Sequence, residues 1–177
     1  MSEVFISVDV ETAGPIPGEY SLLSIGACAA FDDSVTFECF VKPINANFDP
    51  KALDVTGLTL DEMERVGLSP ANAMEDFRRW IRKTTDRNGR PVFVGFNAAF
   101  DWSFVNYYFH RYLGENPFGF AALDIKSLYM GATGCAWGET RSSRIAAHLE
   151  PKLDGNHNAL QDARYQAEMF RLLRSRV

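Results

Sequence analysis

Three segments near the N-terminus, residues 4–12, 21–31 and 35–43, are short and rich in β-branched and other apolar residues, with polar positions between them. This pattern is typical of β-strands. Gly and Pro interrupt residues 14–20, and the polar residues 32–34 are typical of a hairpin turn, so the links between the segments are short. The pattern predicts an antiparallel meander of three strands.

Beyond the meander, apolar residues recur at helical spacing and alternate with short apolar runs. Ser69 is suited to cap a helix that has Pro70 in its first turn. The predicted elements are helices at 69–85, 99–113 and 158–175, a buried strand at 91–98, and a strand that runs into a helix at 120–130. Residues 84–91 and 131–144 are predicted to be mobile loops. Because strands alternate with helices here, part of the sheet is expected to be parallel.

The predicted fold class is therefore α/β, with a mixed central β-sheet flanked by α-helices. The 177 residues are 46% apolar and 23% charged, which is enough apolar material to bury a core. Because the sequence shows no internal repeat, low-complexity tract or linker, we expect residues 1–177 to form a single domain.

Net charge and cysteine use narrow the function classes. The net charge is −5, whereas a protein that follows a long nucleic-acid track usually has a basic excess. A polyanionic ligand is therefore expected to be held at a few points or through metal ions.

The three cysteines form no C-x-x-C pair, and no apolar run reaches the roughly 18 residues that span a bilayer. We expect a reduced, cytoplasmic protein without a membrane partner.

Asp9 and Glu11 place two carboxylates on one face of the first predicted strand. Side chains alternate along a strand, so both acids lie opposite the face formed by Val8 and Val10. Their Cα atoms are expected about 7 Å apart, close enough to share a cation and close enough to repel each other without one.

Two further acids fall on helix faces that are expected to pack against the sheet. Asp101 belongs to the same helical stripe as Phe104 and Tyr108, and Asp162 lies at the edge of the stripe that contains Phe170. An ionised carboxylate that faces a core without a partner is strongly destabilising. Convergence of the acids on a divalent cation explains all of them, because hard cations take oxygen ligands.

His157 precedes Asp162 by five residues, and its neighbours Gly155, Asn156 and Asn158 favour a loop that enters the last helix. From such a loop the imidazole could reach the acidic site. A histidine side chain ordinarily has a pKa near neutrality, which suits a general base that takes a proton from an attacking water.

The segments DVET, FNAAFD and HNALQDA resemble the three motifs of the DEDDh, or DnaQ-like, 3′–5′ exonucleases, which include proofreading subunits, ribonuclease T and oligoribonuclease. The resemblance runs from Asp9 to Asp162 in the right order and includes the flanking Thr12, Asn97 and Phe100. It implies a ribonuclease H-like fold. It also implies hydrolysis of phosphodiester bonds from the 3′ end of single-stranded DNA or RNA, with release of nucleoside 5′-monophosphates.

The same resemblance implies two divalent cations, Mg²⁺ or Mn²⁺, and a role for each motif residue. The first ion would be bound by Asp9, Glu11 and Asp162. Asp9 would also touch the second ion, Asp101 would complete the site, and His157 would accept the proton of the attacking water.

The resemblance further implies contacts to the terminal nucleotide of the substrate. The residues expected to make them are Asn97 as a polar contact, the backbone at Thr12 and Ala13 near the sugar, and Leu22, Leu23 and Phe100 against the base. Candidate phosphate contacts are Lys126, Arg141, Arg144 and Arg164. Several relatives are dimers, and since no segment declares an interface, both a monomer and a homodimer stay open.

Two other function classes also stay open. The VDVET segment is similar to the D-x-D-x-T opening of aspartyl-phosphate phosphatases, although Glu11 stands where that chemistry needs Asp. A non-catalytic module that binds nucleic acid or a protein could have the same fold, but such a binder has no need of so repulsive a cluster. Taken alone, a D-x-E pair is more often exposed or ion-paired than metal-binding. Metal-dependent release of mononucleotides separates the three classes.

Overall fold

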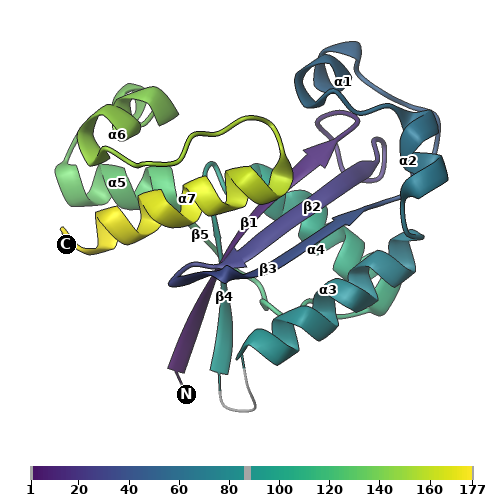
Figure 1. Ribbon diagram of the computed structural model, residues 1–177, viewed down its shortest axis with the longest axis horizontal. Coiled ribbons are helices and arrows are strands. Elements are labelled where there is room, and N and C mark those ends of the chain that lie inside the picture. Colours follow the sequence, from purple (N-terminus) through teal and green to yellow (C-terminus); the bar gives the residue numbers. More distant parts are fainter. Residues whose placement is uncertain (1, 86–88, 177) are drawn as a thin grey trace.

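The computed structural model describes residues 2–85 and 89–176 and shows a five-stranded sheet with helices on both faces (Figure 1). The strands are β1 (Ser2–Thr12), β2 (Leu22–Ala29), β3 (Asp32–Phe40), β4 (Gly89–Gly95) and β5 (Ala122–Asp124). Their order across the sheet is β3-β2-β1-β4-β5. The first three strands pair antiparallel, whereas β4 pairs parallel to β1 and β5 parallel to β4. The predicted α/β class with a mixed sheet is confirmed.

The helices are α1 (Pro50–Thr56), α2 (Leu60–Val66), α3 (Pro70–Thr85), α4 (Ala99–Leu113), α5 (Ile125–Thr133), α6 (Ser142–Leu149) and α7 (Ala159–Arg174), with a short 3-10 helix η1 (Trp137–Glu139). Thus the helices predicted over residues 69–85, 99–113 and 158–175 are confirmed to within a residue or so at each end. Among the residues described, no helix combines the length and the apolar character that crossing a bilayer requires.

The alternation of side chains along β1 divides the interior into two cores. Ile6, Val8 and Val10 are buried against α3 and α4, as the pattern predicts. On the opposite face, Phe5 packs with Phe170 of α7. Because Asp9 and Glu11 share the face of Phe5, the fold directs both carboxylates toward the side that α7 covers.

Some predicted boundaries are wrong. The hairpin turn falls at Ala30–Phe31, ahead of the polar residues 32–34, because Asp32 already pairs with Ala29. The segment 131–144 is not one mobile loop, since it contains the end of α5, all of η1 and the first turn of α6. The loop predicted at 84–91 includes residues 86–88, which lie outside the described residues, and its remainder belongs to α3 and β4.

Three short helices were not predicted. The helices α1 and α2 have seven residues each and are defined mainly by their caps, Asp49 and Thr59, whose side chains accept backbone N–H groups. In α6 only Ile145 and Leu149 are buried. Helices this short bury too few residues to show a helical period, which explains why the pattern did not indicate them.

Candidate active site

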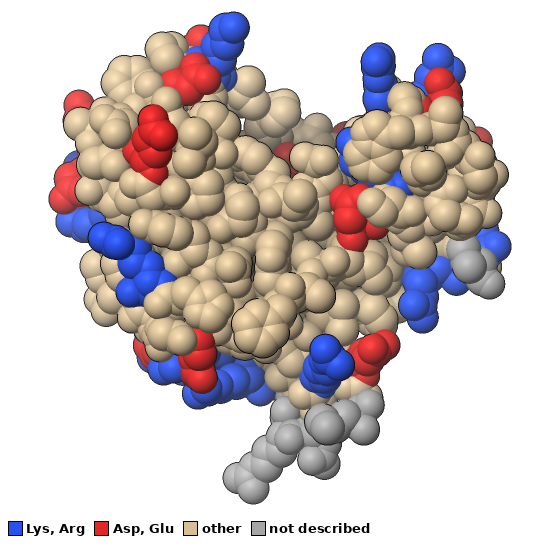
Figure 2. Space-filling model, turned by 180° about the vertical axis from the view of Figure 1, so that it is seen from behind, with Lys and Arg blue, Asp and Glu red and all other residues tan. Residues whose placement is uncertain are grey.

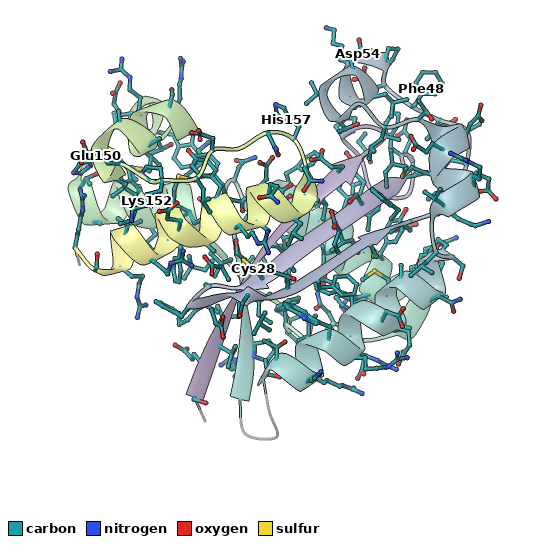
Figure 3. All side chains as sticks on the ribbon, viewed as in Figure 1. Cys28, Phe48, Asp54, Glu150, Lys152 and His157 are labelled. Atoms are coloured by element: carbon teal, nitrogen blue, oxygen red, sulfur yellow. The ribbon has the colours of Figure 1, made fainter. Side chains whose placement is uncertain are left out.

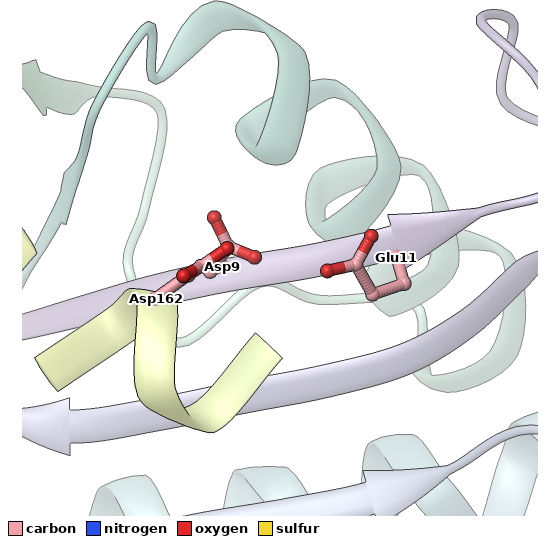
Figure 4. Close-up of side chains that lie close together, drawn as sticks. All are labelled: Asp9, Glu11 and Asp162. Carbon is pink, nitrogen blue, oxygen red and sulfur yellow. The ribbon is translucent and has the colours of Figure 1, made fainter. Parts of the chain in front are cut away.

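Three carboxylates from two distant parts of the chain meet on the α7 side of the sheet. One oxygen from each of Asp9, Glu11 and Asp162 lies within 4.8 Å of the oxygens from the other two. In Figure 4 the carboxylates of Asp9 and Asp162 lie next to each other, and that of Glu11 turns back along β1 toward them. The two β1 acids share a face of the strand, as predicted, and both therefore lie close to the first turn of α7.

Gly26 allows this approach. It pairs with Asp9 across the β1–β2 ladder, and a Cβ atom built at Gly26 would lie 2.1 Å from the carbonyl carbon of Ala159. Real Cβ atoms do not come this close to backbone, so only glycine lets the start of α7 pack this tightly against β2. The close contact sets how near Asp162 comes to the strand acids.

Asp162 also holds the loop that carries His157. Its two carboxylate oxygens accept the backbone N–H groups of Asn156 at 2.8 Å and of His157 at 3.0 Å. His157 is exposed and has a left-handed backbone conformation, with φ of 60°. Figure 3 places it on the loop above the first turn of α7. The candidate base is thus attached through its own backbone to a candidate metal ligand.

Glu168 fixes the earlier part of the same loop. Its two carboxylate oxygens accept the backbone N–H groups of Lys152 at 3.0 Å and of Leu153 at 2.9 Å. Two acids of α7, at positions 162 and 168, therefore bind the loop at both ends. This arrangement limits the conformations of His157 even though the side chain is exposed.

Gln166 fixes the orientation of Asp9. Its Nε2 donates to Asp9 Oδ1 at 2.6 Å, and its Oε1 accepts the backbone N–H of Phe96 at 2.9 Å. Gln166 is 5% exposed, so the two bonds are partly shielded from solvent, which strengthens them. One amide thereby ties α7 to β1 and to the end of β4.

Asp101 lies under β1 from the first turn of α4. Its Oδ1 accepts the backbone N–H of Val10 at 3.0 Å. The β1–β4 ladder ends at the Ser7–Val94 pair, so this part of β1 has no strand partner on that side and the carboxylate replaces one. Asp101 is buried, and it is not a member of the compact group of three carboxylates. Its charge nevertheless contributes to raising the pKa of Asp9.

The charged forms of Asp9, Glu11 and Asp101 are unfavourable without a counter-charge. Burial, then the charges of Asp162 and Asp101, raises the pKa of Glu11 from 4.5 to about 8. Burial raises the pKa of Asp101 from 3.8 to about 7. Burial, followed by the charges of the neighbouring acids, also raises the pKa of Asp9 well above its usual range, and the hydrogen bond from Gln166 opposes this. The fold therefore holds these acids where a cation is needed to keep them ionised at neutral pH.

The donor set fits divalent cations. The three converging groups are all carboxylates, which suit Mg²⁺ or Mn²⁺. None of the ion pairs formed by the described residues involves Asp9, Glu11, Asp101 or Asp162, so no Lys or Arg takes the place of a metal ion there.

A cavity of about 600 Å³ opens beside the cluster. It is lined by Asp9, Phe96, Ser142, His157, Asp162 and Tyr165, among others. It therefore extends from the carboxylates toward α6. Figure 2 shows the surface hollowed between the part of the molecule formed by α1 and α2 and the part formed by α5 and α6.

Two of the residues predicted to contact the terminal base are buried in this structure. Leu22 and Leu23 are both 0% exposed, because the first packs in the main core and the second against Ala13 and Met63. Neither side chain presents a surface to a base here. Phe100, in contrast, is 36% exposed at the start of α4.

The other residues predicted to contact the nucleotide differ in how far they are exposed to solvent. The N–H of Ala13 donates to Ser21 and its carbonyl accepts from Asp49, so this backbone is already paired. Thr12 is 5% exposed. Asn97 is exposed and lies in a left-handed turn just before α4, with φ of 59°, rather than inside the helix. Of these positions, Asn97 has the freest side chain.

Three residues that shape the site were missed at the level of sequence: Gly26, Gln166 and Glu168. Gln166 follows Asp162 by four residues, so it lies on the same face of α7, and a polar residue on that buried face was a usable signal. The roles of Gly26 and Glu168 depend on contacts with α7 and the 150–158 loop, which no local pattern indicates.

Comparison with known proteins agrees with this geometry. The chain matches the exonuclease family RNase_T over residues 6–170. The chain therefore belongs to this exonuclease family. It is 58% identical over 171 residues to the 3′–5′ DNA exonuclease Cap18 of Escherichia coli, an alignment that covers 97% of this chain and 91% of Cap18.

Solved structures show the same fold at lower identity. The nuclease domain of 3′hExo, a DEDDh family member bound to rAMP, superposes with a TM-score of 0.79 at 16% identity, covering 97% of this chain and 92% of that one. E. coli exonuclease I in complex with a dT13 oligonucleotide gives a TM-score of 0.75 at 19% identity, covering 99% of this chain and 42% of that one. The resemblance inferred from the three motifs is confirmed.

Proposed function

We propose that this exonuclease removes nucleotides from the 3′ end of single-stranded DNA by a two-metal mechanism, with Mg²⁺ or Mn²⁺ at the carboxylate cluster. The observation that carries the proposal is the convergence of Asp9, Glu11 and Asp162 within 4.8 Å. The choice of DNA over RNA is supported by the 58% identity to a DNA exonuclease. The products would be nucleoside 5′-monophosphates.

Each acid has a distinct part in this proposal. Asp9, Glu11 and Asp162 would bind the cations, which supply neutralisation of the scissile phosphate and activation of the attacking water. Asp101 would complete the site from below β1, where its bond to Val10 fixes it. Gln166 would keep Asp9 in its binding rotamer through the bond of 2.6 Å.

His157 would accept the proton of the attacking water. The ring is exposed, and the backbone bond to Asp162 keeps the residue at the edge of the cluster, where an imidazole can act as a general base. Asn97 and Phe100, both exposed at the start of α4, would contact the terminal nucleotide. Thr12 would approach its sugar from the end of β1.

The test is digestion of 5′-labelled single-stranded DNA and RNA with Mg²⁺, with Mn²⁺ or with a chelator. We expect a ladder that shortens from the 3′ end, depends on metal and is faster on DNA. A faster ladder on RNA would contradict the substrate assignment, and no ladder with either metal would contradict the function. Release of inorganic phosphate from a small ester instead would indicate the phosphatase class, and neither product would indicate a binding module.

The base is tested separately with His157→Ala. We expect a loss in kcat of about 100-fold or more with the metal concentration for half-maximal activity nearly unchanged. His110→Ala is the matched control, since His110 is exposed at the far end of α4 and should leave the rate unchanged. Equal changes in rate and metal dependence would instead make His157 a ligand. A cytoplasmic location and a homodimer remain predictions from the sequence.

A further inference from the structure

A lysine lies between two aromatic rings next to the carboxylate cavity. Phe96, which lines that cavity with Asp9, has its ring centre 6.0 Å from the Lys126 ammonium. The same ammonium is 4.4 Å from the ring centre of Trp137 in η1. Trp137 is 52% exposed, so a large part of its surface is open beyond the lysine. These three residues, the Phe96–Lys126–Trp137 stack, extend from the active-site cavity to the surface.

Further positive charge follows the stack along the chain. Arg141 precedes α6 and Arg144 lies in its first turn, and both are exposed. The nearest acid to Arg144 is Glu139 at 3.8 Å, a loose contact that leaves the guanidinium available. Figure 2 shows Lys and Arg side chains projecting above the part of the molecule formed by α5 and α6. This side of the cavity therefore carries several cationic side chains in a chain with a net charge of −5, although Glu139 and Asp154 also lie on it.

We propose that the Phe96–Lys126–Trp137 stack, with Arg141 and Arg144, binds the single-stranded DNA that lies 5′ to the bond being cleaved. The inference rests on the proposed function and extends it to the strand that remains after each cut. That strand must leave the carboxylates through an opening, and the cavity at Asp9 continues past Phe96 toward α6. An aromatic face accepts any base by stacking, and the adjacent cations match the phosphates.

The test compares two substrates of different length. An oligo(dT) of about 20 nucleotides reaches the stack, whereas the p-nitrophenyl ester of thymidine 5′-monophosphate reports on the carboxylate centre alone. We expect Trp137→Ala to raise KM for the oligonucleotide about 5- to 100-fold, with little change in kcat and none with the ester. Phe120→Ala is the matched control, because Phe120 is 94% exposed and takes no part in the stack.

The contribution of the basic residues is tested through the salt dependence of oligonucleotide binding. Replacing both Arg141 and Arg144 with Gln should reduce the slope of log affinity against log salt by about 1.4 for the oligonucleotide, measured by fluorescence anisotropy. An unchanged KM in Trp137→Ala, an equal effect on ester and oligonucleotide, or an unchanged salt slope would overturn the inference. If the wild type cleaves neither substrate, the proposed function fails instead, while anisotropy still tests whether the stack binds DNA.

Discussion

In the metal-free protein, the free energy of unfolding should fall as the pH rises from about 5 to 8. Carboxylates in ion pairs usually have the opposite effect. The pKa of Glu11 rises from 4.5 to about 8 and that of Asp101 from 3.8 to about 7 on folding. The folded protein therefore holds protons that the unfolded chain has released in this window. Stability is fully present below the unfolded pKa and is lost as the pH rises toward the folded one.

The size of the effect follows from the pKa of Glu11, which is 8% exposed and little screened by solvent. At 1.36 kcal/mol per pH unit the full rise corresponds to an upper limit of roughly 5 kcal/mol. Most of this stabilisation is lost between pH 5 and pH 8, so we expect Glu11 to contribute a loss of about 3 kcal/mol over that range, with Asp101 adding to it. For a domain of this length, that is a fall of roughly 6–12 °C in Tm.

The assay is thermal unfolding in a chelator across this pH range, repeated with excess Mg²⁺ or Mn²⁺. Metal should remove most of the fall, because the cation compensates the ionised acids. Glu11→Gln should flatten the metal-free profile, whereas Glu19→Gln, at an exposed position, should leave it unchanged. A metal-free Tm that is level or rises from pH 5 to pH 8, or a full slope retained in Glu11→Gln, would refute the reasoning.

Three substitutions test how the site is held. Asp162→Asn should lower activity at least about 100-fold, because it removes a metal ligand. The circular dichroism spectrum should stay native, because the substitution removes one charge from a repulsive cluster. Activity equal to that of the parent protein would show that Asp162 is not a ligand. Gln166→Leu should raise the metal concentration for half-maximal activity about 10- to 100-fold, and exposed Gln161→Leu on the same helix should not. Gly26→Ala should lower both Tm and activity because its Cβ meets the backbone of α7. Gly131→Ala should lower neither, because its Cβ would meet nothing within 4 Å among the described residues outside its own stretch of helix.

The general fold could be predicted because its elements carry their own signals. In β1, the alternation of apolar residues determines which face Asp9 and Glu11 share. In α3, the capping residue and the stripe of apolar residues mark where the helix lies. The short helices α1, α2 and α6 had no such signal, since each buries no more than two residues. The pattern therefore gave the layers of the molecule but not the elements at its rim.

The candidate site was predicted only as far as its acids. Asp9, Glu11 and Asp162 were identified by charges placed on buried faces, and the structure brings them together. The burial of Leu22 and Leu23 was missed, because both positions follow a loop and their partners come from distant residues. Residues that act through geometry, such as Gly26, have no polar group to mark them and become visible only when α7 is placed on the sheet.

The position of Asp162 links metal binding to the base. Both its oxygens already accept N–H groups of the loop that carries His157, so a cation bound by this carboxylate shares oxygens with those hydrogen bonds. Each carboxylate oxygen has more than one lone pair, so the two kinds of contact are compatible. Asp162→Asn removes one acceptor oxygen and so loosens the loop as well as the metal site. A substitution at Glu168 loosens the loop and leaves the ligands in place, which is why comparing the two positions separates placement of the base from binding of the metal.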